Sequence, residues 1–282
     1  MSSTMPNRTG SKSLGREIRG NVADVVLSSL RTFGRAIALA CGAVAGGCVD
    51  LVTGRFHWRE TLHQAWYLVT VTAIPAVLMA VPFGVVVSVQ VGNLIHQVGA
   101  DSLLGAAGGL GVIQQGAPMA TGLLLGGAGT ATIAADLGAR RIREEIDALD
   151  TMGISPLHRL VIPRMAAMLF IAPLLNVLII FTGVLSGYAV ATGIQGVTPG
   201  SYWSAFGSFT SPTDLVISLV KAALFGLIVV VVACQRGLEA AGGPRGVADG
   251  VNAAVVLSIV GISVTNVIVT QFVTMFLPTK FA

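Results

Sequence analysis

Charged side chains are scarce in this chain of 282 residues, where Asp, Glu, Lys and Arg make up 11% and hydrophobic residues 54%. A soluble domain usually carries about 25% charged residues. A soluble chain of this composition would expose too much apolar surface to stay dispersed. Lys and Arg are absent between Arg59 and Arg140, and again between Arg164 and Lys221. This shortage excludes an ordinary soluble domain and predicts an integral membrane protein.

Motifs for enzymatic and metal chemistry are also missing. No G-x-x-x-x-G-K-[ST] occurs, so the chain has no P-loop for ATP phosphates, and neither HExxH nor GxSxG is present. The three cysteines are an odd number without CxxC spacing, which argues against a disulfide framework or a zinc site. The four histidines do not form a metal-binding spacing. We therefore expect no catalytic residue, no metal, no cofactor bound by this chain and no nucleic-acid partner.

Long apolar runs are what the chain does have. A bilayer-spanning helix needs roughly 20 apolar residues, and five stretches meet that requirement. Lys and Arg gather in the second and fourth of the loops between them and are absent from the first and third, as expected when positive loops stay in the cytoplasm. The sequence thus predicts an all-α protein of the inner (plasma) membrane, with its N-terminus in the cytoplasm and its C-terminus outside. The predicted spans are about 66–91, 112–135, 166–191, 215–233 and 253–276.

The N-terminal region, residues 1–63, differs from the membrane domain predicted for residues 64–282. Its first 35 residues are polar and basic and lack the apolar core and cleavage site of a signal peptide. From about 20 to 53, apolar residues recur at three- and four-residue spacing with Arg31 and Arg35 off the stripe. This pattern favours an amphipathic helix lying in the inner membrane interface. Because the second half of the stretch is mostly apolar, a sixth span stays open as the alternative.

Three residues of the predicted spans are candidates for a lipid cavity. Pro75 and Pro82 should kink or break the first span, because proline removes a backbone donor and clashes with the preceding turn. Broken helices at membrane depth line cavities or are buried in protein, although ordinary kinking is the plainer interpretation. Lys221 lies well inside the fourth span. It either snorkels to the outer interface or faces the cavity and attracts an anionic lipid group.

The second loop is unlike the rest of the chain, because six of the ten residues from Arg140 to Leu149 are charged. Ile142, Ile146 and Leu149 recur at helical spacing, which predicts one short charged helix with a narrow apolar stripe. Such a helix at the cytoplasmic ends of two spans suits docking onto a soluble partner. The alternative is a solvated positive loop, which has no need for carboxylates or an apolar stripe.

This loop also carries a family resemblance. Residues 134–164 read AADLGARRIREEIDALDTMGISPLHRLVIPR. Together with stretches 58–62, 219–226 and 242–247, this run resembles the MlaE/YrbE permease family, and in particular the A-type subunit of its actinobacterial YrbE branch. These are membrane subunits of ABC lipid transporters paired with MCE proteins. The resemblance implies five spans plus an N-terminal interfacial helix. It also implies a coupling helix that contacts an ATPase, to which Arg143, Glu144, Glu145, Asp147, Ala148 and Leu149 would belong.

The family further implies partners and a function. The partners would be a second YrbE-type permease subunit in a heterodimer, a cytoplasmic ABC ATPase dimer that binds ATP and Mg²⁺, an MCE protein hexamer outside, and a lipid substrate. The expected function is ATP-driven lipid or fatty-acid import across the cell envelope. The alternative is a non-transporting membrane anchor that only holds MCE proteins in place.

Overall fold

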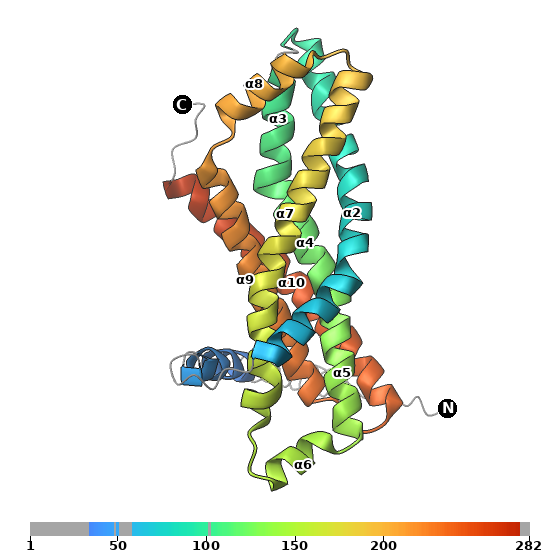
Figure 1. Ribbon diagram of the computed structural model, residues 1–282, viewed down its shortest axis with the longest axis vertical. Coiled ribbons are helices and arrows are strands. Elements are labelled where there is room, and N and C mark those ends of the chain that lie inside the picture. Colours follow the sequence, from blue (N-terminus) through green and yellow to red (C-terminus); the bar gives the residue numbers. More distant parts are fainter. Residues whose placement is uncertain (1–33, 48, 51–57, 101–102, 277–282) are drawn as a thin grey trace, which may run out of the picture. The chain divides into compact units, whose positions relative to one another are not determined.

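The computed structural model describes residues 34–47, 49–50, 58–100 and 103–276, and within them every regular element is a helix (Figure 1). The N-terminal tail and most of the predicted interfacial helix lie outside the described residues. The described part of that region forms an apolar helix, Gly34–Gly47. The described residues divide into two units, with the boundary between Gly42 and Ala43, and the five long helices all belong to the second unit.

Five long apolar helical stretches could each cross a membrane, which confirms the predicted number of spans. Each is longer than its predicted apolar core, with between 27 and 40 residues. At about 1.5 Å per residue, all of them exceed a hydrocarbon core of about 30 Å. They are α2 (Trp58–Gln97), the run from α3 to α5 (Leu104–Ile142), η4 with α7 (Leu157–Gly193), α9 (Pro212–Leu238) and α10 (Pro244–Phe276).

The second and third spans contain π-helical segments that the sequence did not predict. In the second, η2 (Val112–Gly116) follows α3 (Leu104–Gly111), and η3 (Leu125–Gly129) separates α4 (Ala117–Leu124) from α5 (Thr130–Ile142). In the third, η4 (Leu157–Val161) opens into α7 (Ile162–Gly193). π-Helical turns widen a helix locally and are frequent at functional sites.

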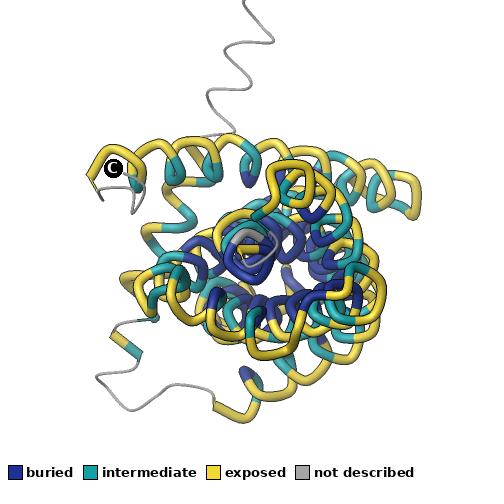
Figure 2. Tube along the Cα trace, turned by 90° about the horizontal axis from the view of Figure 1, so that it is seen from above, coloured by how far each residue is buried: buried dark blue, intermediate teal, exposed yellow. Residues whose placement is uncertain are grey.

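The helix α7 has the most buried positions and packs against both α2 and α9, while α9 also packs against α5 and α10. Figure 2 shows the buried positions gathered toward the middle of the bundle. Helix α2 meets α7 through small residues: a Cβ built on Gly84 would lie 2.2 Å from the carbonyl oxygen of Gly183. Close approach of backbones through small residues is a common way for helices to associate in lipid. The buried stripe of α2 comprises Leu68, Thr72, Ala76, Ala80, Gly84, Ser88 and Gly92.

Polar side chains connect three of the spans inside the bundle. Asn176 Nδ2 of α7 donates to Ser218 Oγ of α9 at 2.8 Å, and Thr121 Oγ1 of α4 donates to Asn176 Oδ1 at 3.2 Å. All three side chains are buried. No water competes for these groups in hydrocarbon, and each such hydrogen bond stabilises the association of the helices by about 1 kcal/mol.

The prolines of the first span kink it without breaking it. Helix α2 stays helical through Pro75 and Pro82, and Figure 1 shows its N-terminal part inclined to the rest. Both prolines lie on the exposed face of α2, away from the stripe that packs on α7. The two positions without a backbone donor therefore lie on the side of α2 that the other described helices do not cover.

The third loop contains a further helix, α8 (Pro199–Phe209), which was not predicted from the sequence. The side chain of Thr198 accepts a bond from the backbone nitrogen of Ser201 and so caps this helix. Tyr202 of α8 is buried, and its ring meets that of Tyr188 of α7 edge to face at 5.3 Å. Aromatic packing thus fixes α8 on the end of the bundle whose two loops, residues 96–111 and 192–214, lack Lys and Arg.

Candidate coupling site at the arginine-rich end

The charged run after the second span is two helices and not the single helix predicted from Arg140 to Leu149. Helix α5 ends at Ile142, and α6 runs from Glu145 to Thr151. Between them Glu144 adopts a left-handed conformation with φ 58° and ψ 16°. The left-handed conformation costs a non-glycine residue roughly 1–2 kcal/mol, so glycine usually occupies such a position. Because this position holds glutamate, the sequence gives no sign of the turn.

Because of this turn, Ile142, Ile146 and Leu149 do not form the continuous apolar stripe predicted from the sequence. Ile146 is buried at 5% exposure and anchors α6, whereas Ile142 at the end of α5 is 39% exposed. Leu149 lies at intermediate exposure. Helix α6 is therefore attached to the bundle chiefly through one isoleucine and through the ion pairs of its first turn.

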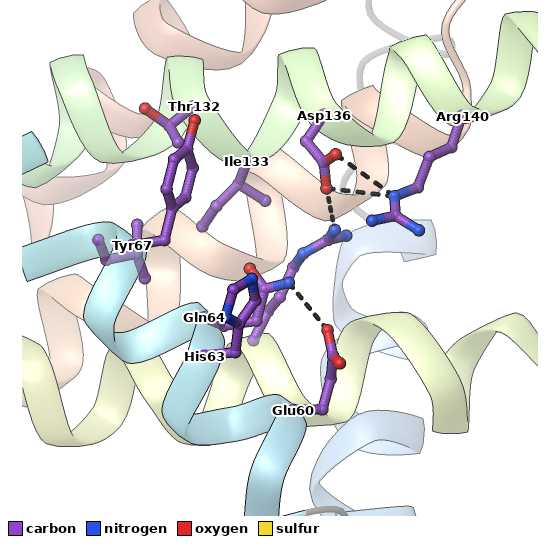
Figure 3. A pocket seen from close by; sticks show the side chains of 10 residues that line it. Glu60, His63, Gln64, Tyr67, Thr132, Ile133, Asp136 and Arg140 are labelled. Carbon is purple, nitrogen blue, oxygen red and sulfur yellow. Dashed lines mark hydrogen bonds and ion pairs between the residues drawn. The ribbon is translucent and has the colours of Figure 1, made fainter. Parts of the chain in front are cut away.

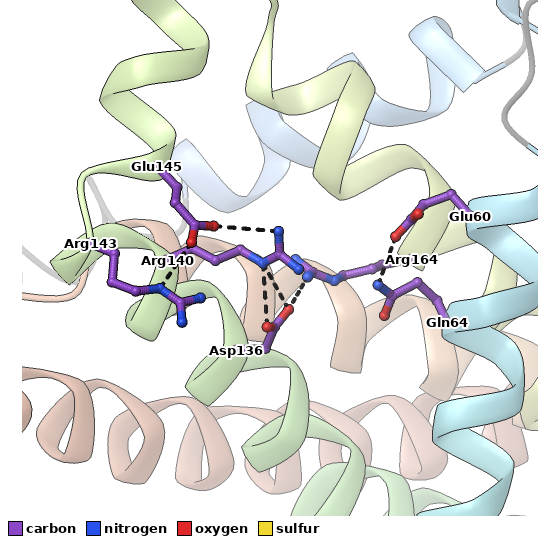
Figure 4. Close-up of polar contacts among 7 residues, drawn as sticks. All are labelled: Glu60, Gln64, Asp136, Arg140, Arg143, Glu145 and Arg164. Carbon is purple, nitrogen blue, oxygen red and sulfur yellow. Dashed lines mark hydrogen bonds and ion pairs between the residues drawn. The ribbon is translucent and has the colours of Figure 1, made fainter.

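Those ion pairs place Glu145 between two arginines of the preceding segment. Glu145 Oε1 lies 2.9 Å from Arg143 Nε, and Glu145 Oε2 lies 3.6 Å from Arg140 Nη1. Arg140 Nε in turn donates to both carboxylate oxygens of Asp136 at 3.3 Å. One arginine is thus shared between a carboxylate of α6 and a carboxylate of α5 (Figure 4).

The series continues into the third span, because Arg164 Nη2 donates to Asp136 Oδ2. We call Glu145, Arg140, Asp136 and Arg164 the ion-pair chain. Its inner end is desolvated, since the side chain of Arg164 is only 2% exposed, and its outer members are half-exposed. It joins α6, α5 and the start of α7 through successive ion pairs, of which the last involves a buried charge.

The sequence pointed to Arg143, Glu144, Glu145, Asp147, Ala148 and Leu149 but missed Asp136 and Arg164. Arg164 counted only as one more positive charge of the cytoplasmic loop. The sequence did contain a signal for this pair: Asp136 ends the second apolar run, and Arg164 stands at the start of the third. Two such charges at the same membrane depth on neighbouring helices are expected to pair.

The outward face of α6 remains available for a partner. Glu144, Asp147 and Ala148 are exposed, as is Asp150 beyond them, while Asp147 also pairs with Arg141. Two apolar side chains just past the helix, Met152 and Ile154, are exposed as well, at 63% and 43%. Exposed apolar side chains rimmed by polar residues are typical of interaction surfaces.

Lys221 does not snorkel to the outer interface. Its side chain is buried, and Nζ donates to Thr270 Oγ1 of α10 at 2.8 Å and to the carbonyl oxygen of Gln114 in η2 at 3.3 Å. Gln114 Nε2 also donates to Asp214 Oδ1 at 3.0 Å. Within this chain Lys221 thus belongs to a polar cluster of η2, α9 and α10, in which Pro75 and Pro82 take no part. Whether any of the three contacts lipid stays a prediction.

Comparison with known proteins decides the family. The family model described as Permease MlaE matches residues 61–272. The chain belongs to the MlaE permease family. Among MlaE relatives, a probable ABC transporter permease protein of Synechocystis is 28% identical over 218 residues, which cover 77% of this chain and 83% of the relative. The intermembrane phospholipid transport system permease protein MlaE of Haemophilus influenzae is 26% identical over 232 residues, covering 82% and 87%.

A plant relative extends the comparison beyond bacteria. The chloroplastic protein TRIGALACTOSYLDIACYLGLYCEROL 1 of Arabidopsis thaliana is 26% identical over 235 residues, covering 83% of this chain and 67% of that protein. The matched MlaE region contains α6 and the whole ion-pair chain. The resemblance predicted from the sequence is therefore confirmed at the level of the MlaE family, while the actinobacterial A-type branch stays a prediction.

Proposed function

We propose that the chain is the membrane-spanning permease subunit of an ATP-driven lipid transporter. The proposal is supported by relatives named as ABC transporter permeases, one of them of a phospholipid transport system. We infer that ATP and Mg²⁺ are bound by a separate cytoplasmic ATPase dimer and that this chain binds no cofactor. The arginine-rich end would face that ATPase, as positive loops stay in the cytoplasm.

The ion-pair chain is the observation that carries the proposal. An ATPase that moves α6 changes the distance between Glu145 and Arg140, which already shares its charge with Asp136. When Arg140 moves relative to Asp136, the strength of the ion pair between Asp136 and Arg164 at the start of α7 changes as well. Because α7 packs against α2 and α9, the motion reaches the spans that would border a lipid cavity.

On the membrane side, we infer that a second YrbE-type permease subunit, as a heterodimer, completes an apolar cavity. Pro75 and Pro82 would line its wall on the exposed face of α2, and Lys221 would attract an anionic group of the lipid. Narrowing the cavity lowers its affinity for a lipid tail, because buried apolar contact is lost at about 25 cal/mol per Å². An MCE hexamer outside would exchange lipid with it, and the direction would be import.

The test is charge reversal on the exposed face of α6. We expect Glu144→Lys combined with Asp150→Lys to abolish ATPase co-purification and lipid uptake in cells, because both carboxylates are exposed and neither belongs to the ion-pair chain. The matched control is Asp249→Lys, an exposed carboxylate at the start of α10. Unchanged uptake and ATPase binding in the double variant would contradict the proposal and favour the membrane anchor.

A further inference from the structure

A cavity of about 390 Å³ lies at the arginine-rich end, between the first turns of α2, one side of α5 from Thr132 to Arg140, and Arg164. Figure 3 shows its side chains approaching from α2 and α5, with Asp136 and Arg140 on one side and Glu60, His63 and Gln64 on the other. It is distinct from the outward face of α6 and from the polar cluster of Lys221. Its wall mixes apolar groups with charged ones.

The exposed side chains of α2 indicate how deep this cavity lies in a bilayer. Arg59 and His63 are exposed at the beginning of the helix, and Trp66 and Tyr67 follow at 74% and 52% exposure. Beyond them the large exposed hydrophobic side chains are mostly aliphatic, starting with Ile74, with Phe83 as the aromatic exception. An order of charged, aromatic and aliphatic groups marks the passage from water through the interface into hydrocarbon. The cavity, which ends at Leu68, therefore lies at headgroup depth.

Two ionic groups of the wall are incompletely paired. Arg164 Nη1 is buried and has no hydrogen-bond partner within the described residues, although Nη2 binds Asp136. Glu60 accepts a bond from Gln64 Nε2 at 3.1 Å and pairs with no cation in the same part of the chain. A buried polar nitrogen without a partner, such as Nη1 of Arg164, is rare and calls for a ligand or water. Arg164 and Glu60 thus line one cavity, Arg164 with a guanidinium nitrogen that lacks a partner and Glu60 with a carboxylate whose charge no cation of the described residues balances.

We propose that this cavity binds the headgroup of an ethanolamine-type phospholipid from the leaflet on the arginine-rich side. Its phosphate oxygens accept from the guanidinium groups of Arg164 and Arg140, which form strong charge-assisted bonds with phosphate. Its ammonium donates to Glu60, and its acyl chains leave past the exposed ring of Tyr67. The site would report the lipid of that leaflet to the ion-pair chain, because both arginines belong to it. This inference does not rest on transport.

Native mass spectrometry of the detergent-purified chain, without an ATPase, tests the proposal. Dihexanoyl phosphatidylethanolamine and dihexanoyl phosphatidylglycerol are titrated separately; both supply a phosphate, but only the ethanolamine lipid supplies an ammonium. We expect the wild type to bind the ethanolamine lipid about fivefold more tightly, the effect of one half-exposed ion pair. Glu60→Gln keeps an acceptor for Gln64 but removes the charge, and should abolish this preference. Asp249→Asn, a carboxylate outside the cavity, should retain it.

Two further variants separate the phosphate contact from folding. Arg164→Gln should lose both lipids, and Thr132→Trp, which fills the cavity from α5 without touching a charge, should do the same. Equal binding of the two lipids by the wild type, or a preference that survives Glu60→Gln, would overturn the proposal. Displacement of both lipids by millimolar inorganic phosphate would assign the site to free phosphate and overturn the lipid as its ligand.

Discussion

Arg164 shows how far one residue can differ from the role its sequence neighbourhood suggests. In the sequence it closes a positive loop, and in the structure its side chain is 2% exposed and bound to Asp136. Taking a guanidinium out of water costs several kcal/mol unless a carboxylate compensates it. Asp136 is thus the residue that permits Arg164 to enter the bundle, and Arg140 is its exposed second partner.

Removing the shared carboxylate should be far worse than removing its exposed partner. We expect Asp136→Ala to destabilise the detergent-solubilised protein by about 3–5 kcal/mol, because Arg164 is left buried without a counter-charge. Arg140→Ala should cost about 1 kcal/mol or less, since Arg140 is about one-third exposed and water replaces its bonds. Thermal unfolding midpoints measure both, and equal shifts would show that Arg164 is not held by Asp136.

Glu144 offers a second test at this scale. Its φ of 58° favours glycine, so Glu144→Gly should leave α6 in place and raise the free energy of unfolding by about 1 kcal/mol. Glu144→Val should lower it, because a β-branched residue avoids the left-handed region. Denaturant unfolding of both variants checks the sign. A stabilising valine would mean that α5 and α6 form the single helix that the sequence predicted.

At the scale of elements, α2 and α7 depend on close contact through glycine. A Cβ on Gly84 would meet the backbone and the side chain of α7 at 2.2 Å, at Gly183 O and Ser186 Oγ. Backbone cannot yield as a flexible side chain can, so the two helices would have to separate. The five spans therefore hold together by shape as much as by apolar area, in line with the abundance of glycine in the chain.

We expect Gly84→Ala to destabilise the protein by about 2 kcal/mol through overpacking. The matched control is Gly207→Ala in α8, where an added Cβ meets nothing within 4 Å. That change should be neutral or stabilise by up to about 1 kcal/mol, the helix propensity of alanine over glycine. The comparison is made by thermal unfolding in one detergent. A harmless alanine at 84 would show that the contact with α7 is looser than described.

The elements that the sequence predicted are those that local composition specifies. The five spans follow from apolar length, which needs no knowledge of neighbours. The break at Glu144, the π-helical segment around Gln114 and helix α8 were not predicted, because each depends on tertiary partners. Glu144 is held by the ion pairs on both sides of it, and α8 by the ring of Tyr188 packing on Tyr202. The sequence accordingly predicted the charged segment of the site, residues 143–149, but not the ion pairs that connect this segment to Arg164.

At the scale of the whole protein, the two ends of the membrane domain differ in chemistry. One end carries α6, the ion-pair chain and the headgroup-sized cavity, all built on arginine and carboxylate. The other carries α8 with its aromatic packing and no Lys or Arg between Thr192 and Asp214. ATP-driven coupling through α6 requires the first end to be in the cytoplasm, where an ATPase can act on α6, and the second to face outside.

Cysteine labelling in intact cells tests this requirement most directly. A membrane-impermeant maleimide is applied to Thr151→Cys at the exposed end of α6 and to Ser208→Cys on the exposed face of α8. The wild type, with its native Cys41, Cys48 and Cys234, gives the background. We predict that Cys at 208 is labelled in intact cells, and that Cys at 151 is labelled only after the membrane is opened. Labelling at 151 in intact cells would contradict ATP-driven coupling through α6.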